Sequence, residues 1–588
     1  MQDEMNKLKG DHKIPFKILM KKTLQYVKPE WLSFVIALLL IGANVGLDLY
    51  LPILVKNITN ELLKESFEYK TILIWSCLYI GISFMSMVFI YFESMLLQKA
   101  GQRIIYKLRI DIFSHIENMS QNQFNEMPVG SLVTRVANYT QSMSDLFTNV
   151  LVNIVKNAIY VVAVYVFMYS ISWQLSLIML IPVTIVAISS FIFSRIVHKV
   201  FRKERACVSD MNTYLNENLS GMKITQIFNQ QKFKEEEFNE KNKELFKARF
   251  GVTICFGIYR PFITFVYMAS VAVTFFFGFS FGLDAGGIVA FYMYLSKFFN
   301  PVQQLADQLN NLQKALTASE RLFNLLEVSP EVRDKEDAIE IDHFKGKIEF
   351  RNVWFAYKDE EWILRDVSFV IEPKQTVAFV GATGAGKTTI LGLIVRNFEI
   401  QKGQILIDDI DITTVKIKSL RKAIGQMLQD VFLFSGTIKE NITLHDEMYN
   451  DDEVMEVCKY VNADSFIDKL PEKLNYQVLE SGENFSQGQR QLLSFARTVL
   501  AKPQILILDE ATANIDTETE VLIQESLEKI KNIGTMLVVA HRLSTIQHAD
   551  QIMVLQKGEI IEHGNHQELL AKHGHYYKLY KLQYENKE

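Results

Sequence analysis

A glycine-rich stretch in the second half of the chain has the residue types and spacing of a phosphate-binding loop. Residues 377–394 read VAFVGATGAGKTTILGLI and match the pattern G-x-x-x-x-G-K-[ST] at Gly381, Gly386, Lys387 and Thr388. The glycines let backbone N–H groups cradle phosphates, and the N-terminus of the following helix adds a favourable field. Lys387 can neutralise phosphate charge, and Thr388 can ligate Mg²⁺. The spacing predicts a nucleotide-binding loop between a strand and a helix.

A second stretch, ILILDEATANID at residues 505–516, leads an apolar strand into two adjacent carboxylates, Asp509 and Glu510. Desolvation and mutual repulsion both oppose two like charges at the end of a buried strand. Mg²⁺ beside Asp509 would supply the missing positive charge, as in P-loop ATPases. Glu510 is then free to polarise the attacking water. A third apolar strand ends in LVVAHRL, and we expect His541 of this stretch to reach the γ-phosphate.

These residues need an α/β sheet to position them. A charged linker, EVSPEVRDKEDAIEIDHFKG, precedes a pattern of short strands that alternate with helices. Because loops from the carboxyl ends of such strands converge on one crevice, we expect the residues above to meet there. The predicted strands are 348–355, 376–380, 404–408, 504–508, 535–540 and 551–556.

The first half of the chain is instead dominated by apolar runs long enough to cross a bilayer. Runs 72–92, 157–194 and 261–283 carry no charge, whereas Asp48 interrupts the run 33–55 and Lys297 the run 286–306. Since 157–194 is long enough for two spans, the count is six. The predicted fold is multidomain: an all-α six-helix transmembrane domain followed by an α/β P-loop domain. The expected parts are a cytoplasmic amphipathic elbow segment (1–30), a transmembrane domain (31–325), a linker (326–345) and a nucleotide-binding domain (346–588).

Charge predicts how the spans are oriented. Segments 95–145 and 196–250 hold many Lys and Arg residues, whereas the short loops at 170–173 and 282–286 hold none. By the positive-inside rule, the long segments and both termini are cytoplasmic. The long segments also look helical, so the spans are expected to continue past the bilayer. The net charge of −5 argues against a general nucleic-acid binder.

Charged and polar residues inside the apolar runs are candidates for membrane function. A charge in hydrocarbon is costly, so Asp48 is expected to face a cavity or a partner. Contact with a substrate or a proton, and a structural hydrogen bond, both remain open. Lys297 and Arg260 are expected to extend toward the cytoplasm. The expected cavity lining from the first and last spans is apolar and aromatic with a few polar residues, which suits an amphipathic ligand but selects none: Asn44, Asp48, Tyr292 and Tyr294.

Residues 345–575 resemble an ATP-binding cassette domain in the order and spacing of their motifs. These are FAYK with Tyr357, the glycine loop, QDVFLFSGTIKENI opening with Gln429, FSQGQRQ, ILILDEA, ANID and AHR. Residues 15–325 resemble the six-span exporter domain of the same family. Within them, FNEMPVGSLVTRVANYTQSM and YLNENLSGMKITQIF resemble the two cytoplasmic turns that touch nucleotide domains.

The resemblance implies ATP and Mg²⁺ as cofactors and a role for each matching residue. Tyr357 would stack on adenine, and Asp516 would help to link two sites across a dimer interface. The helix that starts at FSQGQ, which corresponds to the family's signature motif, would face the γ-phosphate held by a partner chain. Two cassettes would then close around two ATP molecules. The implied nucleotide contacts are Tyr357, Gly381, Thr383, Gly384, Ala385, Gly386, Lys387, Thr388, Thr389, Ser486, Gly488 and Gln489. The implied metal-side residues are Thr388, Gln429 and Asp509, and the implied catalytic residues are Glu510, His541 and Gln429.

Two departures from the family pattern bear on the partner. The signature LSGGQ reads FSQGQ here, with Gln487 in place of a glycine, and ANID replaces the commoner SALD. These variants resemble the glutamate-bearing half of heterodimeric bacterial multidrug exporters. A second half-transporter is therefore the expected partner. A heterodimer is favoured, and a homodimer stays open.

The predicted function is an ATP-hydrolysing exporter subunit that moves amphipathic compounds, drugs or lipids, out of the cytoplasm by alternating access. It would lie in the bilayer of a bacterial cell membrane and bind no nucleic acid. A soluble cassette acting on DNA or ribosomes is excluded by the six spans. A nucleotide-gated channel of the same architecture is the alternative, and the intact Glu510 argues for turnover instead.

Overall fold

The computed structural model describes residues 13–358, 361–428, 431–509, 517–539 and 546–584. The chain forms two compact units. The helical unit comprises Met1–Glu117 and Met127–Val328, and the α/β unit comprises Asn118–Glu126 and Ser329–Glu588. A helical transmembrane part followed by an α/β nucleotide-binding part confirms the predicted fold class.

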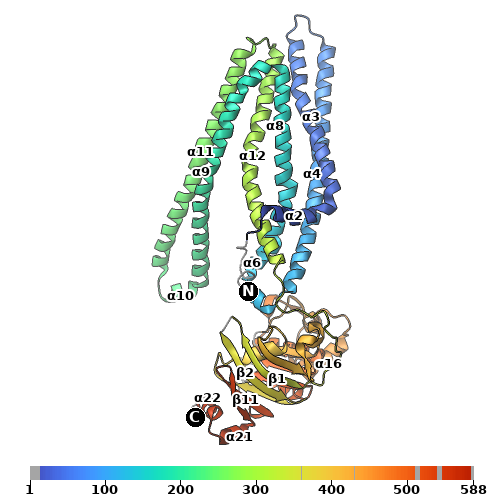
Figure 1. Ribbon diagram of the computed structural model, residues 1–588, viewed down its shortest axis with the longest axis vertical. Helices are drawn as coiled ribbons and strands as arrows, with labels where there is room; N and C mark the ends of the chain where they lie inside the picture. The colour runs from blue at the N-terminus through green and yellow to red at the C-terminus, as the bar shows by residue number, and fades with distance from the viewer. Residues whose placement is uncertain (1–12, 359–360, 429–430, 510–516, 540–545, 585–588) are drawn as a thin grey trace. The chain divides into compact units, whose positions relative to one another are not determined.

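The helical unit is built from long helices that run side by side (Figure 1). Three of them have 48 or 49 residues, which corresponds to about 70 Å of helix and exceeds the hydrocarbon core of a bilayer. The predicted extension of the spans is thus confirmed. The principal helices are α2 (Phe16–Val27), α3 (Trp31–Leu62), α4 (Tyr69–Glu117), α8 (Val152–Ile171), α9 (Trp173–Ser220), α11 (Gln231–Gly278) and α12 (Ala285–Leu326). Shorter ones are α6 (Val129–Thr134), α7 (Thr140–Asp145) and α10 (Met222–Ile227).

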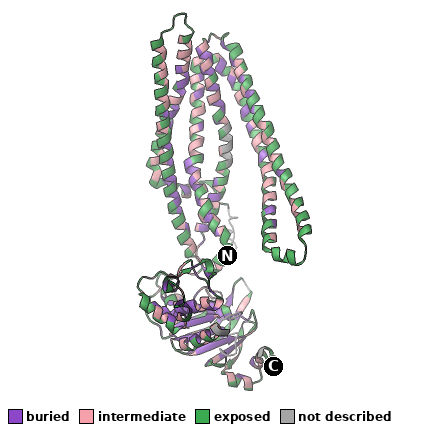
Figure 2. Cartoon of the chain, turned by 180° about the vertical axis from the view of Figure 1, so that it is seen from behind, coloured by how far each residue is buried: buried purple, intermediate pink, exposed green. Residues whose placement is uncertain are grey.

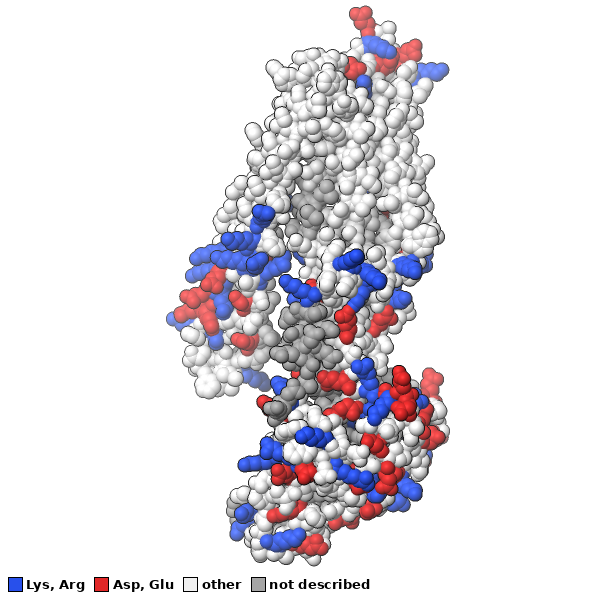
Figure 3. Space-filling model, in the orientation of Figure 1, with Lys and Arg blue, Asp and Glu red and all other residues white. Residues whose placement is uncertain are grey.

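Five helical stretches among the described residues are long and apolar enough to span a membrane. They are Phe16–Leu62, Tyr69–Glu117, Val129–Ile171, Trp173–Ser220 and Gln231–Gly278. The sixth expected span falls on α12, so the count of six stays a prediction. Many large apolar side chains of these helices are exposed (Figure 2), and a long part of the visible surface lacks charged residues (Figure 3). Such a surface suits lipid as its surroundings.

The N-terminal helix α2 lies within the expected elbow segment and buries one of its faces. Its buried residues, Leu19, Thr23 and Val27, recur every four positions and therefore share one face. The exposed residues Phe16, Ile18 and Leu24 lie on other positions of the same helix. The helix thus packs one face on the helical unit. Its exposed apolar side chains suit contact with a second apolar environment.

The α/β unit contains two main sheets. The six-stranded sheet has the order β12-β11-β3-β10-β9-β6, and its β11-β3-β10-β9-β6 portion is parallel. Its strands are β3 (Thr376–Val380), β6 (Ile424–Met427), β9 (Ile505–Asp509), β10 (Thr535–Val539), β11 (Gln551–Gln556) and β12 (Glu559–Gly564). The antiparallel sheet has the order β2-β1-β4-β5, formed by β2 (Trp362–Ile371), β1 (Ile348–Ala356), β4 (Lys402–Ile407) and β5 (Ile410–Asp411).

All six predicted strands are present, and their ends agree within two residues. The pattern missed β2, β6 and β12, and also the two-residue strands β5, β7 (Gly436–Thr437) and β8 (Gln477–Val478). Strand β2 contains Arg365 and Asp366 and pairs with β1 through irregular register, which breaks the alternation that signals a strand. Strand β6 has only four residues, too few for a periodic signal.

Helices cover both faces of the parallel sheet, whose central strands are buried throughout (Figure 2). One apolar core lies among β1, β2, β3 and α13 (Lys387–Ile394), and a second lies around α18 (Gln487–Leu500). The other helices of this unit are α5 (Gln121–Asn125), α14 (Ile417–Lys422), α15 (Ile438–Thr443), α16 (Asp451–Tyr460), α17 (Asp464–Ile467), α19 (Thr517–Ile530), α21 (His566–Ala571) and α22 (His575–Tyr584).

Candidate functional site

The carboxyl ends of four neighbouring parallel strands define the candidate nucleotide site. Strands β6, β9, β10 and β3 pair in this order and run in the same direction, so their carboxyl ends share one edge of the sheet. The glycine loop follows β3, and Asp509 is the last residue of β9. The predicted site residues Gln429, Glu510, Asp516 and His541 lie outside the described residues.

The glycine loop has a backbone that larger residues would strain. Gly384 and Gly386 have φ values of 81° and 102°, in the left-handed region that favours glycine. A Cβ atom on Gly386 would lie 2.7 Å from Cδ2 of Leu364, and one on Gly381 would lie 2.3 Å from the carbonyl oxygen of Leu555. Tight packing therefore requires glycine at the two ends of the motif. The turn it permits leads directly into α13, whose N-terminus suits an anion.

Lys387 is held over this loop by backbone carbonyls. Its side chain is buried, and Nζ donates hydrogen bonds to the carbonyl oxygens of Gly381 (2.7 Å) and Ala382 (3.1 Å). Burial lowers the pKa of the Lys387 ammonium, and the negative charge of Asp509 opposes this shift. The loop, the cation and the carboxylate fit a phosphate group with Mg²⁺, because each supplies the donor or charge that such a ligand requires.

Tyr357 lies beside the helix that begins at the loop. Its hydroxyl is 3.0 Å from Oγ1 of Thr389, and its ring makes edge contacts with Phe355 and Phe398 at centroid distances of 4.9 and 5.2 Å. Tyr357 as a whole residue is 39% exposed, so a nucleotide base can approach it. The hydroxyl of Thr389 is therefore hydrogen-bonded to Tyr357 in this structure. Of the other predicted nucleotide contacts in this loop, Thr383, Gly384 and Thr388 are exposed and Ala385 is buried.

The signature residues form the N-terminus of α18. Ser486 is its N-cap: Oγ accepts a hydrogen bond from the backbone N–H of Gln489 (3.3 Å), while the Gln489 side chain accepts one from the N–H of Ser486 (2.9 Å). Gly488 is buried, and Gln487 is half-buried as the first residue of the helix. The sequence interpretation missed the capping role of Gln489. A 14-residue helix capped in this way presents a favourable field to an anion at its exposed start.

Asp48 has partners from two other helices of the helical unit. Its Oδ2 accepts hydrogen bonds from Nζ of Lys297 on α12 and from the hydroxyl of Tyr160 on α8, and Lys297 Nζ also lies 3.4 Å from that hydroxyl. The expectation that Lys297 extends toward the cytoplasm is wrong, because Asp48 offers its ammonium a counter-charge. The guanidinium of Arg260 lies over the ring of Phe256, 5.6 Å from its centroid.

Two residues expected to line a cavity instead join helices. Asn44 is buried and accepts a hydrogen bond from the hydroxyl of Ser86 (2.6 Å). Tyr294 is fully buried, and its hydroxyl donates to the carbonyl oxygen of Leu49. Their place in the expected lining was therefore wrong, because neighbouring helices satisfy their polar groups. Tyr292 remains 41% exposed.

The sequence interpretation missed a second ion pair in the helical unit. Nζ of Lys156 lies 3.1 Å from Oε1 of Glu93, whose side chain is buried. The positions of the two residues in the sequence could have revealed this ion pair. Glu93 follows the uncharged run 72–92 directly, and Lys156 directly precedes the run 157–194. Opposite charges that border two spans are suited to pair when the helices pack.

A cavity of about 850 Å³ lies between α9, α11, α12 and the helices that precede α8. Arg205, Lys314 and Arg321 supply basic groups to its wall, and Phe201 and Phe256 supply apolar surface. The acid in the lining is Glu204, and Nε of Arg249 lies 3.6 Å from its carboxylate. Arg321 also donates a hydrogen bond to the hydroxyl of Tyr139 (2.8 Å). The lining thus combines an apolar part with an excess of positive charge.

Comparisons with known proteins match both units. The family described as ABC transporter transmembrane region matches residues 32–302, and the family described as ABC transporter matches residues 364–513. A probable multidrug resistance ABC transporter ATP-binding/permease protein of Bacillus subtilis is 40% identical over 88% of this chain and 77% of its own length. A fatty acid ABC transporter ATP-binding/permease protein of Mycobacterium bovis is 36% identical over 83% and 78%.

Two further similarities extend the comparison. An ATP-dependent lipid A-core flippase of Syntrophus aciditrophicus is 34% identical over 84% of this chain and 83% of its own length. The solved structure of a bacterial Atm1-family ABC exporter with ATP bound superposes with a TM-score of 0.78 at 25% identity. That match covers 94% of this chain and 98% of the exporter.

Proposed function

The chain belongs to the ABC transporter family and is an ATP-hydrolysing exporter subunit, and from this premise we propose that it moves amphipathic compounds out of the cytoplasm as one half of a dimer. The observation that carries the proposal is the position of Lys387 over a loop whose left-handed turns favour glycine, near Asp509 at the end of β9. This site lies in the same chain as helices long enough to cross a membrane.

We assign the chemistry of the site to residues from four strand ends. Lys387 holds the β- and γ-phosphates, Tyr357 faces the adenine, and Glu510 accepts the proton of the attacking water. Mg²⁺, held by Thr388, Gln429 and Asp509, neutralises phosphate charge when it is bound. His541 contacts the γ-phosphate, and the remaining loop residues donate backbone N–H groups. Ser486, Gly488 and Gln489 present the start of α18 to the nucleotide of the partner chain.

We further propose that the preferred cargo carries an acidic headgroup. Arg205, Lys314 and Arg321 face one cavity with Phe201 and Phe256, which suits an anionic group joined to an apolar body. Asp48 does not offer a comparable site for a cation, because Lys297 already neutralises it. The relatives include a probable multidrug resistance transporter, a fatty acid transporter and a lipid A-core flippase, which supports amphipathic cargo.

We base the proposed assembly and placement on the resemblance to the family. We propose that a different half-transporter completes the dimer, since Gln487 alters the signature that serves the partner's nucleotide. A homodimer is the alternative. We place both termini in the cytoplasm of a bacterial cell, with an elbow segment at 1–30, a transmembrane domain at 31–325, a linker at 326–345 and a cassette at 346–588.

The cargo proposal is tested with inside-out membrane vesicles that contain the dimer. We expect ATP to drive uptake of a fluorescent fatty acid, and Arg205→Gln with Lys314→Gln to reduce it about tenfold, because each cation contributes a charge-assisted contact. Uptake of a fluorescent cationic dye should not fall. Lys203→Gln is the matched control, since Lys203 is exposed on α9 and is not part of the described cavity lining. Equal loss of fatty acid uptake in the control, or none in the double variant, would refute the acidic-cargo proposal.

A further inference from the structure

Arg396 is a cation buried within the α/β unit, two residues beyond the end of α13. Its side chain is 2% exposed, although a guanidinium in such a position requires a hydrogen-bond partner for nearly every N–H group. Its backbone has a φ of 54°, which turns the chain sharply after the helix. Because α13 begins at Lys387, Arg396 lies at the far end of the helix that starts the nucleotide loop.

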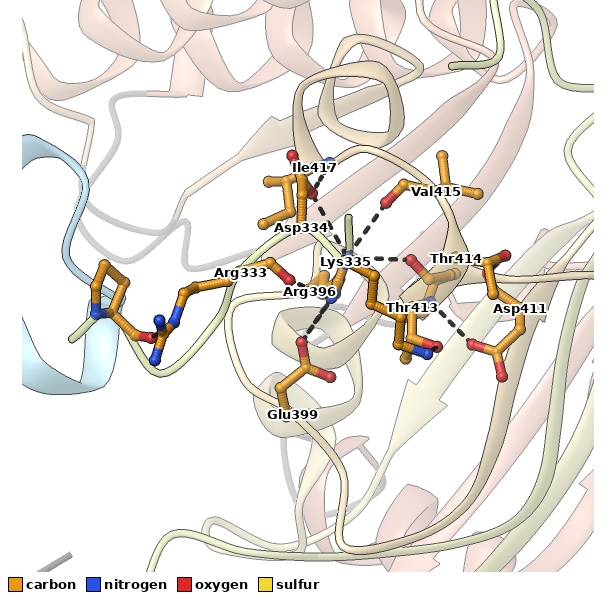
Figure 4. Close-up of polar contacts among 12 residues, drawn as sticks. Arg333, Asp334, Lys335, Arg396, Glu399, Asp411, Thr413, Thr414, Val415 and Ile417 are labelled. Carbon is orange, nitrogen blue, oxygen red and sulfur yellow. Dashed lines mark hydrogen bonds and ion pairs between the residues drawn. The ribbon is translucent and has the colours of Figure 1, made fainter. Parts of the chain in front are cut away.

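The guanidinium of Arg396 joins three separate segments (Figure 4). Nε donates to the carboxylate of Glu399 at 2.9 Å, within the same loop. Nη1 donates to the carbonyl oxygens of Ile412 (3.3 Å) and Val415 (3.2 Å), which follow β5. Nη2 donates to the carbonyl oxygen of Arg333 at 2.9 Å, in the linker. A planar fork of donors is needed for this pattern, and lysine cannot reproduce it.

The two linker residues that follow Arg333 also bond to other segments of the α/β unit. The carboxylate of Asp334 lies 3.8 Å from Nη1 of Arg396 and accepts a hydrogen bond from the backbone N–H of Ile417 (2.8 Å). Nζ of Lys335 donates to the hydroxyl of Thr413 at 2.9 Å. The segment around residues 333–335 is therefore a fixed part of the fold, with Arg396 as its buried anchor.

The same linker holds the short helix that follows α4. The Gln123 side chain of α5 is 1% exposed and donates to the carbonyl oxygen of Ser329 (2.8 Å), and it accepts from the N–H of Glu331 (3.4 Å). The Glu331 carboxylate accepts from Ser120 and Asn122, each at 3.3 Å. Residues 118–126 therefore belong to the α/β unit, although α4 itself belongs to the helical unit. The segment 118–126 overlaps only the start of the stretch 124–143 that the sequence predicts as a cytoplasmic turn, and the contact residues Ser120, Asn122 and Gln123 precede that stretch.

We propose that Arg396 is a positioning residue that couples the nucleotide loop to the cytoplasmic end of α4 through the linker. The contacts run from α13 to Arg396, from Arg396 to residues 333–334, and from residues 329–331 to Gln123. The linker also continues directly from α12, so it connects two membrane helices to the far end of α13. The inference rests on the proposed nucleotide site. It adds the contacts through which nucleotide binding at that site affects the membrane helices.

A spatial chain of contacts is not by itself evidence of coupling, so the test measures coupling directly. Hydrogen exchange of the full-length dimer is followed by mass spectrometry with and without ATP and Mg²⁺, in the Glu510→Gln background that is expected to bind without hydrolysis. Two peptides are read: residues 387–396, which report the nucleotide loop, and residues 106–117, which report the end of α4. In the parent, ATP should slow exchange in both peptides.

Arg396→Lys should keep the ATP response at residues 387–396 and reduce the response at residues 106–117 by a factor of about 2 to 30. Arg421→Lys is the matched control. Its guanidinium donates to the carbonyl oxygens of Val395 (3.3 Å) and Arg396 (3.2 Å) in the same loop. Its charge also acts on Asp334, and lysine keeps that charge, but its described hydrogen bonds do not reach the linker. The control should leave both responses unchanged.

Gln123→Leu tests the other end of the route, and it answers the question even if Arg396→Lys does not fold. It should reproduce the loss at residues 106–117. A full response at residues 106–117 in either folded variant, or its absence in the parent while residues 387–396 respond, would overturn the proposal. An absent response at residues 387–396 in the parent would instead reject the nucleotide site on which the proposal rests.

Discussion

The two units of this chain hold the nucleotide-site cation and the charges between membrane helices differently. In the α/β unit, the Lys387 ammonium donates its described hydrogen bonds to backbone carbonyls, whereas Arg396 also pairs with the carboxylate of Glu399. In the helical unit, the pairs Asp48–Lys297 and Glu93–Lys156 join different helices. A cation held by carbonyl dipoles keeps its charge and can receive an anion. A cation paired with a carboxylate is already neutralised.

This difference indicates where ligand binding is expected in each unit. In the α/β unit the retained charge of Lys387 marks the nucleotide site. In the helical unit the ion pairs instead connect helices. A charged ligand group is expected to bind in the cavity lined by Arg205, Lys314 and Arg321. The predictions below test this contrast by changing one partner of each kind of contact.

The largest effect is expected from Glu510→Gln. The carboxamide keeps the size of the side chain but cannot accept a proton, so turnover should fall by about 10² to 10⁴. Affinity for ATP should stay unchanged because the phosphate cradle is intact. ATPase activity of the assembled dimer and binding of labelled ATP measure the two quantities. More than half of the parent's turnover in the variant would remove Glu510 from its catalytic role.

Lys387→Ala should abolish tight nucleotide binding at this site. Loss of charge-assisted hydrogen bonds to phosphate in a desolvated cradle weakens binding by about tenfold or more. Lys374→Ala is the matched control, because this exposed lysine precedes the same strand, β3, at its other end. Titration with labelled ATP should separate the two variants. If Lys387→Ala and Lys374→Ala bind ATP with equal affinity, the charge of Lys387 does not bind the phosphates.

Asp48→Asn should destabilise the helical unit by leaving Lys297 without its counter-charge, by about 1–3 kcal/mol. The double variant with Lys297→Gln should recover most of that loss, because both charges are then absent. Thermal unfolding in lipid nanodiscs measures the cycle. If Asp48→Asn and the double variant unfold at the same temperature as the parent, the pair does not hold α3 and α12 together.

Tyr160→Phe should have the smallest effect. It removes the hydroxyl that donates to Asp48 but leaves the ion pair with Lys297, and a hydrogen bond between membrane helices contributes about 0.6 kcal/mol on average. The same unfolding measurement should show a shift well below that of Asp48→Asn. A larger shift than Asp48→Asn would mean that the hydroxyl, and not the ion pair, dominates this contact.

Much of the nucleotide site could be predicted from the sequence because its chemistry is local. The loop, its glycines and Lys387 lie within seven positions, and the apolar run before Asp509 marks its strand directly. The capping role of Gln489 was missed although Ser486 and Gln489 match the S-x-x-Q capping-box pattern, because both residues were interpreted only as nucleotide contacts. Gln429, Glu510 and His541 lie outside the described residues and remain predictions.

The contacts of the helical unit were harder to predict because they join distant positions. Asp48 and Lys297 are 249 residues apart, and Glu93 and Lys156 are 63 apart. Hydropathy indicates which residues enter the membrane but not which helix faces meet. For the same reason Asn44 and Tyr294 were expected in a cavity lining, whereas each is satisfied by a neighbouring helix.

Accumulation against a gradient tests most directly the claim that hydrolysis at this site drives export. Inside-out vesicles containing the dimer are loaded with a fluorescent fatty acid at equal concentration on both sides, and ATP is then added outside. We predict net accumulation in the lumen that requires Glu510 and is lost in Glu510→Gln. A parallel sample starts with a gradient of the same fatty acid. If ATP only speeds the decay of that gradient and causes no net accumulation from equal concentrations, the result would contradict an ATP-driven exporter and favour a nucleotide-gated channel. Accumulation that is unchanged in Glu510→Gln would also contradict the account.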